Sequence, residues 1–263
     1  MLAMLRYFTV LCLLFCPPLG AASAAAPIEK SIAVGAGVEV PVSVFPARGD
    51  SLLLWLPSET GLVAAERNAA ASLSQQGIEV WLADTLFARF LPILASSLEK
   101  VPAEDVSQLI DAAHRETGKT VVLVTAGRGA VPALQGAALW GRQHAQHRDA
   151  LAGAILIHPN LYVATPEPGE DVDYRPVATQ TRLDLIVLQG ELSPLYWRLD
   201  ALQEKLELGG SRVIVRTLKG TRDRFYAREA TSVPLPSEDA MAARLPELMY
   251  DAWRELRDRK GAK

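Results

Sequence analysis

Residues 121–134, VVLVTAGRGAVPAL, constrain the fold of this chain more than any other stretch. An unbroken run of apolar, mostly β-branched residues is typical of a strand that is buried on both faces. Two glycines separate this run from the alanines and leucines of a helix. The stretch therefore predicts a strand, a tight turn and a helix, in that order, which is the building unit of a parallel sheet.

Similar units recur along the chain. Apolar strands are expected at residues 51–56, 78–82, 120–125, 152–158, 184–189 and 212–218, and helices at 63–76, 103–117, 131–146, 195–208 and 238–257. Residues 31–45 alternate apolar and polar side chains around two glycines, which predicts an antiparallel hairpin. The order predicts an α/β fold: a three-layer α/β/α sandwich with a mostly parallel central sheet and an N-terminal antiparallel hairpin.

One long segment fits neither pattern. Residues 160–183 contain three prolines and four acidic residues and follow a predicted strand. We expect them to form a short cap or lid over the carboxyl edge of the sheet. Residues 25–263, this segment included, are expected to form a single domain.

The first 24 residues have the layout of a signal peptide. Arg6 precedes an apolar run at residues 7–15, and Ala22-Ser23-Ala24 supplies an A-x-A cleavage site. We therefore expect cleavage near Ala24 and a bacterial periplasmic or secreted protein. A membrane anchor is the alternative, although the run is short for a bilayer. Acylation of Cys16 is another, disfavoured because its neighbours are Phe15 and Pro17 rather than small residues.

Composition limits the partners of the mature chain. Both cysteines, Cys12 and Cys16, lie in the signal segment, so no disulfide is expected after cleavage. Cleavage also removes Arg6, and the remaining 26 basic and 30 acidic residues give a net charge of 26 − 30 = −4. A mildly acidic domain has no overall electrostatic reason to bind nucleic acid or anionic lipid. No stable membrane span is expected once the signal peptide is removed.

The order of elements resembles the α/β-hydrolase superfamily over nearly the whole mature chain. Four stretches carry the likeness: VVLVTAGRGA resembles the strand, elbow and helix, LLLWLPSETG the oxyanion strand and loop, IVLQGELSP the strand and loop of the acid, and VRTLKGTRDRF those of the histidine. The resemblance implies that fold and a site at the carboxyl edge of the sheet.

The family's catalytic positions hold other residues here. The elbow pattern G-x-S-x-G falls on residues 125–129, which places Gly127 where the family has its nucleophile. The acid position falls on Ser193, and the histidine position falls near Arg222 or Asp223. Loss of the nucleophile or the base alone costs such enzymes about a million-fold in rate. The resemblance therefore implies a hydrolase fold without its triad.

The elbow still offers features that favour ligand binding. Amides at the start of a helix attract anions, and we expect those after Gly127 to be unpaired. Arg128 adds a cation, and the loop that replaces the histidine carries Lys219, Arg222 and Arg224. In the alternative interpretation, these loop cations are solvated and paired with Asp223 and Glu229. The predicted ligand-binding residues are Ser58, Gly127, Arg128, Gly129, His158, Ser193, Arg222 and Asp223.

These observations predict an exported, non-catalytic hydrolase-like protein. It would bind a small ligand, anionic if the basic residues converge, or another exported protein. The rival hypothesis is an active hydrolase or esterase that uses other pocket residues, with the hydroxyls of Ser58 and Thr125 as candidates. No cofactor is expected. No metal is expected either, because His144 and His147 share a helix face but lack an acidic third ligand at suitable spacing.

Overall fold

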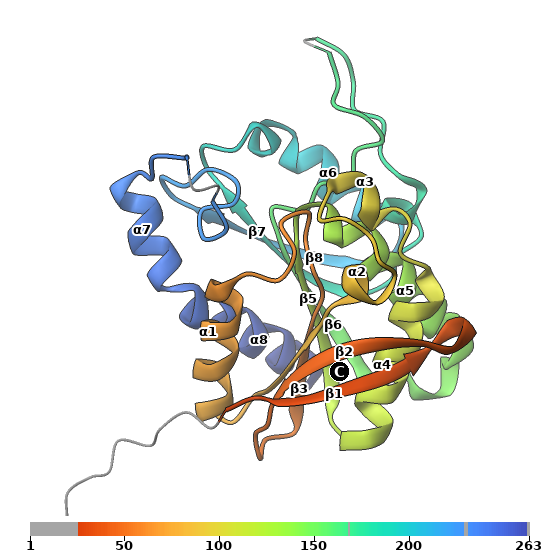
Figure 1. The fold of residues 1–263 in the computed structure, drawn as a ribbon. Coiled ribbons are helices and arrows are strands. Elements are labelled where there is room, and N and C mark those ends of the chain that lie inside the picture. The colour runs from red at the N-terminus through yellow and green to blue at the C-terminus, as the bar shows by residue number, and fades with distance from the viewer. Residues whose placement is uncertain (1–25, 168, 229–230, 262–263) are drawn as a thin grey trace, which may run out of the picture.

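The computed structural model describes residues 26–167, 169–228 and 231–261 (Figure 1). The predicted signal peptide, residues 1–24, lies outside this part of the chain. None of the helices within it combines the length and the apolar character needed to cross a lipid bilayer.

The described residues form one eight-stranded sheet in the order β1-β2-β4-β3-β5-β6-β7-β8. Strands β1 and β2 form the predicted hairpin, β2 pairs antiparallel with β4, and all later pairings are parallel. The predicted mostly parallel sheet with its N-terminal hairpin is confirmed. The strands are β1 (Ile28–Val34), β2 (Val38–Phe45), β3 (Ser51–Trp55), β4 (Glu79–Ala83), β5 (Thr120–Ala126), β6 (Leu151–Ile157), β7 (Asp184–Gly190) and β8 (Arg212–Leu218).

Helices cover both faces of the sheet, which explains why its central strands are apolar without interruption (Figure 1). In β3, Leu52 and Leu54 pack on one face while Leu53 and Trp55 pack on the other. The first face is covered by α4 (Ala103–Thr117), α5 (Ala130–Gln143) and α6 (Leu199–Leu208), and the second by α1 (Ala64–Gln75) and α8 (Leu245–Gly261).

Three local predictions differ from the structure. Two four-residue helices, α2 (Thr85–Ala88) and α3 (Ala95–Leu98), follow β4 and are too short to give a periodic pattern. The predicted helix at 131–146 ends at Gln143, and the 3₁₀ segment η3 (Ala145–Ala150) follows it. The predicted closing helix is divided into α7 (Pro236–Ala243) and α8, because Pro246 lacks an amide hydrogen and its ring would crowd the preceding turn.

The connections that leave the carboxyl ends of the parallel strands meet along one edge of the sheet. The segment after β6 makes a bridge between Tyr162 and Tyr174, and it contains the 3₁₀ turn η4 (Pro176–Thr179) before β7. Another 3₁₀ segment, η5 (Pro194–Arg198), follows β7 and leads into α6. Open α/β sheets bind ligands at this edge, so the candidate site is built there.

Candidate functional site at the carboxyl edge

The turn between β5 and α5 has the predicted strand, turn and helix form. It is the 3₁₀ segment η2 (Gly127–Gly129), and Gly127 has a φ of +53°, in the left-handed region. Gly129 allows a close approach, since a Cβ there would lie 2.1 Å from Oγ1 of Thr125 and 2.5 Å from the carbonyl oxygen of Pro57. Gly129 is therefore required by the packing of the turn, and glycine at position 127 removes the cost of its left-handed backbone.

The carboxylate of Glu59 fills the space where a side chain at position 127 would begin. A Cβ added to Gly127 would lie 2.2 Å from Oε2 of Glu59. The amide of Arg128 donates a hydrogen bond to this oxygen at 2.9 Å, and Nη2 of Arg224 lies 3.4 Å from Oε1. The Glu59 side chain is only 13% exposed. The prediction that the amides after Gly127 are unpaired is therefore wrong for Arg128.

His158 is a neutral, buried side chain at the end of β6. Its φ is +46°, and 3% of the residue is exposed. Burial lowers the pKa of His158 to about 4, although the negative charge of Glu59 opposes this shift. The amide of Gly190 donates to Nδ1 at 3.3 Å, which places the ring proton on Nε2. Nε2 has no hydrogen-bond partner among the described residues.

Asp223 and Ser193 lie beside this histidine. Oδ1 of Asp223 is 3.5 Å from Nδ1 of His158, and Gln189 donates to the same oxygen at 3.4 Å. Burial raises the pKa of Asp223, while hydrogen bonds from Ser193 and Gln189 lower it. Ser193 is buried and its Oγ accepts from the amide of Leu195. Ser193, at the position that resembles the family's acid site, thus contacts Asp223, at the position that resembles its histidine site. A serine stands in place of the acid, and an acid in place of the histidine.

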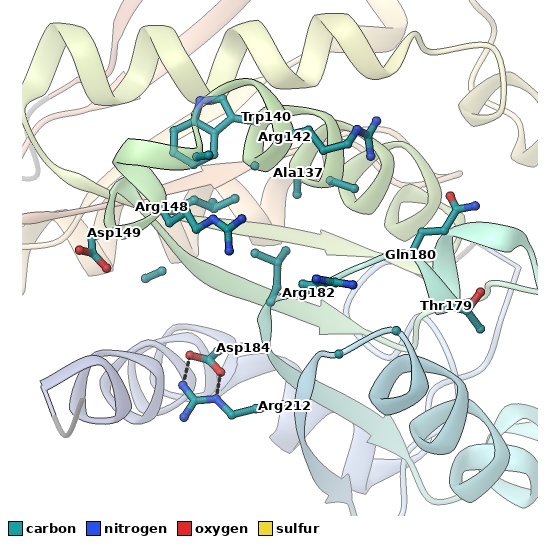
Figure 2. Close-up of a pocket in the computed structure, with 18 of the residues that line it drawn as sticks. Ala137, Trp140, Arg142, Arg148, Asp149, Thr179, Gln180, Arg182, Asp184 and Arg212 are labelled. Atoms are coloured by element: carbon teal, nitrogen blue, oxygen red, sulfur yellow. Dashed lines mark hydrogen bonds and ion pairs between the residues drawn. The ribbon is translucent and has the colours of Figure 1, made fainter.

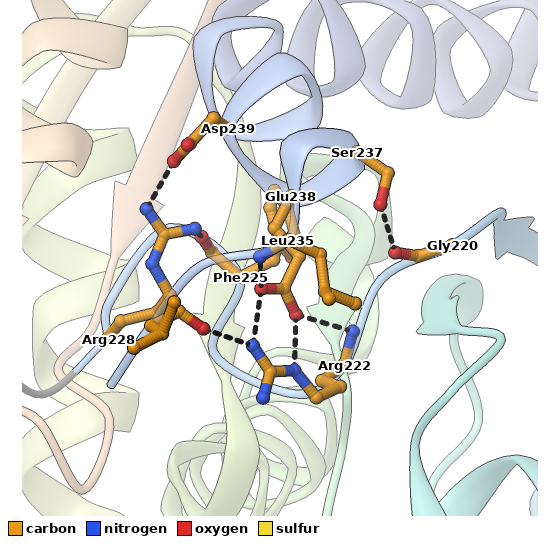
Figure 3. A network of polar contacts seen from close by, with 9 residues as sticks. Gly220, Arg222, Phe225, Arg228, Leu235, Ser237, Glu238 and Asp239 are labelled. Atoms are coloured by element: carbon orange, nitrogen blue, oxygen red, sulfur yellow. Dashed lines mark hydrogen bonds and ion pairs between the residues drawn. The ribbon is translucent and has the colours of Figure 1, made fainter.

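The three predicted arginines lie against carboxylates from other segments. Both Nε and Nη2 of Arg222 donate to Glu238 of α7 at 2.7 Å, and this lowers the pKa of Glu238 to about 2 (Figure 3). The Arg128 side chain lies against Glu99 and the carbonyl oxygen of Tyr162. Lys219 is exposed. Of the cations predicted to converge, only Arg224 lines the cavity described next.

A cavity of about 300 Å³ lies between these groups. Four predicted residues line it: Ser58, Gly127, His158 and Asp223. Arg128, Gly129, Ser193 and Arg222 do not, although the amide of Arg128 and the hydroxyl of Ser193 bind side chains that do. The remaining lining residues are Glu59, Thr60, Ala126, Asn160, Leu195, Arg224, Tyr226 and Ala227.

Glu59 is the residue that the sequence-based site omits. It stands in the SETG loop, and in this structure that loop faces the turn after β5, where the amide of Arg128 binds the Glu59 carboxylate. An acidic residue in this loop, combined with a glycine at the nucleophile position, was the available signal. The described residues contain no group of three or more His, Cys, Asp or Glu side chains arranged to hold a metal ion.

The contact between Gly127 and Glu59 predicts strong coupling between these positions. In Gly127→Ala, the Glu59 carboxylate must move away and lose its charged hydrogen bond, at a cost of about 1.5–3 kcal/mol. The left-handed backbone adds about 1–2 kcal/mol. In a Glu59→Ala background only the backbone cost should remain. Urea unfolding of both single variants and the double variant measures the coupling.

Gly118 supplies the matched control for this cycle. Its φ is +69° and a Cβ there would meet no atom within 4 Å. Gly118→Ala should therefore cost only the backbone term, equally with and without Glu59. Equal costs for Gly127→Ala in the two backgrounds would contradict the proposed contact.

The low pKa of His158 predicts a loss of stability in mild acid. An unfolded histidine has a pKa near 6.5, so below that pH the unfolded state binds a proton that the folded state, with a pKa of about 4, does not. Relative to His158→Gln, the wild type should lose about 2 kcal/mol of unfolding free energy between pH 7 and pH 5. Glu66, whose pKa burial raises to about 7, titrates in the opposite sense in both proteins. The difference between their urea curves thus isolates the histidine, and a constant difference would contradict a buried neutral ring.

Comparisons with known proteins identify the architecture but no sequence family. No protein-family model matches the chain, and no curated protein matches it by sequence. Among solved structures, carboxyl esterase 2 from the fungus Tuber melanosporum has a TM-score of 0.61 at 14% identity, covering 90% of this chain and 89% of its own. Esterase 2 of Thermogutta terrifontis, phosphorylated by paraoxon, has a TM-score of 0.59 at 12% identity, covering 87% and 95%.

A hyperthermophilic esterase from the archaeon Pyrobaculum calidifontis gives a TM-score of 0.58 at 12% identity, covering 84% of this chain and 82% of its own. These likenesses extend over most of each chain. At such low identity these likenesses show the fold alone, and the chemistry has to be argued from the residues of the site. The chain therefore has the α/β-hydrolase fold, with structural relatives among the esterases.

Proposed function

We propose that this chain is an exported, non-catalytic member of the α/β-hydrolase fold that binds a small ligand with an anionic group in the carboxyl-edge cavity. The observation that carries the proposal is the Glu59 carboxylate against Gly127. This contact supports both parts of the proposal. The carboxylate occupies the place of a nucleophilic side chain, and its presence there indicates that the position favours an anion.

Acyl transfer needs a nucleophile and an N–H group that stabilises the oxyanion. Gly127 supplies no nucleophile, and the amide of Arg128 is already bound to Glu59. A base must also accept a proton on Nε2 while a carboxylate orients Nδ1–H. In His158 the amide of Gly190 occupies Nδ1, so Nε2 carries the proton and is a donor. The nucleophile, the oxyanion donor and the base are thus each missing for a different reason.

The same contacts support anion binding. The amide of Arg128 and the guanidinium of Arg224 hold a carboxylate, and that carboxylate belongs to the protein itself. A ligand carboxylate would take the place of Glu59 when this side chain swings aside. The Nε2–H of His158, which lacks a partner among the described residues, is a further donor on the cavity wall. A volume of about 300 Å³ suits a small molecule.

The rival function is an esterase that uses the hydroxyl of Ser58 and the pair of His158 and Asp223. The pair lies within 3.5 Å, which is the observation in its favour. Ser58 bonds to Thr60 at 2.7 Å and to no imidazole. The hydroxyl therefore has no base in contact to take its proton, and the binding function is preferred.

Intact-mass spectrometry tests export and catalytic loss together. Protein recovered from the periplasm of an expressing bacterium should have the mass of a chain that begins at Ala25, because the signal peptide is proposed to end at Ala24. A fluorophosphonate probe should then add no mass, since no activated serine is present. The esterase of Thermogutta terrifontis, which paraoxon phosphorylates, is the positive control. Stoichiometric labelling of any serine would replace this proposal with the esterase.

Competition with Glu59 tests the ligand class. Sodium acetate should raise the melting temperature of Glu59→Ala at concentrations about tenfold lower than those needed for the wild type, because the variant has no internal carboxylate to displace. Sodium chloride at equal ionic strength controls for screening. Glu247→Ala, which removes another arginine-paired glutamate, should behave as the wild type. Equal acetate responses in Glu59→Ala and the wild type would exclude anion binding here.

A further inference from the structure

A second and larger cavity, of about 1060 Å³, opens at the opposite edge of the sheet. It lies where β6, β7 and β8 begin, between the end of α5, the η3 segment and the end of α6 (Figure 2). The carboxyl-edge site lies at the other ends of these strands, and the two cavities share no lining residue. A ligand in one therefore makes no direct contact with the lining of the other.

The lining of this amino-edge cavity is rich in arginine. Four arginines face two aspartates, an excess of two positive charges in a chain whose formal net charge is −3. Arg212 forms a bidentate ion pair with Asp184. The other three, Arg142, Arg148 and Arg182, make no ion pair with any residue in the described part of the chain.

This concentration is unusual within the molecule, because most of its described arginines have a carboxylate partner. The three side chains come from separate elements: Arg142 from α5, Arg148 from η3, and Arg182 from the connection before β7 (Figure 2). Cations that share a concave wall raise the local positive potential and attract anions. Guanidinium groups match phosphate and carboxylate oxygens with paired hydrogen bonds.

Two glycines fix the shape of the wall that carries Arg182. A Cβ on Gly209 would lie 2.8 Å from the carbonyl carbon of Thr179, so only glycine lets the end of α6 approach this connection. Gly210 has a φ of +97°, and a Cβ there would lie 3.3 Å from Cγ of Arg182. The Arg182 stem therefore lies over Gly210, which positions its guanidinium beside the cavity. Ala137, Leu151 and Leu183 add apolar surface to the lining.

We propose that the amino-edge cavity binds an organic anion that carries two or more phosphate or carboxylate groups. Arg142, Arg148 and Arg182 supply the charge, and the neighbouring apolar side chains accept the carbon skeleton of the ligand. The volume of about 1060 Å³ exceeds what one inorganic anion fills, and the arginines come from different elements, so a ligand with spaced anionic groups fits best. This site does not depend on the function proposed for the carboxyl edge.

Calorimetric titration with sodium pyrophosphate and with sodium citrate, at low ionic strength, tests the proposal. We expect saturable binding of at least one probe, weakened about tenfold or more in the double variant Arg148→Gln/Arg182→Gln, because this variant loses two of the three guanidinium groups proposed to bind the anion. Tighter pyrophosphate binding would identify a phosphate ligand, and tighter citrate binding a carboxylate ligand.

Two control variants separate this cavity from other cations. Arg244→Gln and Arg254→Gln each remove an exposed arginine that lines neither cavity, the first paired with Glu247 and the second with Asp251. Both should bind the two probes as the wild type does, and circular dichroism should show that every variant is folded. The proposal is overturned if neither probe binds at millimolar concentration, or if the double variant binds as tightly as the controls.

Discussion

One carboxylate ties together three connections at the carboxyl edge of the sheet. Glu59 comes from the connection after β3, the Arg128 amide from the turn after β5, and the Arg224 guanidinium from the connection after β8. A charged hydrogen bond of this kind contributes about 1.5–3 kcal/mol. The arrangement requires glycine at position 127, because any Cβ there would overlap the carboxylate. The apex can hold either a nucleophilic side chain or the Glu59 carboxylate, and it cannot hold both.

The remaining polar groups follow from this exclusion. A serine at the apex would need an imidazole base, whereas a carboxylate there is better served by a donor. His158 is a donor rather than a base, since burial keeps its ring neutral and the Gly190 amide leaves the proton on Nε2, which reaches no partner among the described residues. Asp223 sits beside the ring, and burial raises its pKa, but it receives no proton from Nδ1 because that atom accepts from the Gly190 amide. The site contains a histidine and an aspartate, the residue types of acid–base chemistry. The imidazole proton, however, lies on Nε2, the atom that must be unprotonated in a catalytic base.

The fold was predictable because its signals are local and periodic. The apolar run of β3 shows a strand with two buried faces, and the glycines at 127 and 129 mark the turn without any knowledge of tertiary contacts. The site was predictable only in outline. Glu59 and Arg128 are separated by 69 residues and Arg222 and Glu238 by 16, and no periodicity reports such side-chain pairs. The prediction therefore marked the correct edge and several lining residues, but it left the Arg128 amide unpaired and did not identify the glutamates that pair with the arginines.

The two edges of the sheet also differ in whether their arginines are paired with carboxylates of the protein, and this difference affects how readily each edge can bind an anion. At the carboxyl edge, Arg128, Arg222 and Arg224 each lie against a glutamate from another segment. An incoming anion must break such a pair, so the gain from the new contact is offset by the loss of the old one. At the amino edge, no ion pair within the described residues has to be broken at Arg142, Arg148 or Arg182. For anions of equal charge, the two proposals together therefore imply binding at the lower concentration at the amino edge, because at the carboxyl edge Glu59 must first be displaced.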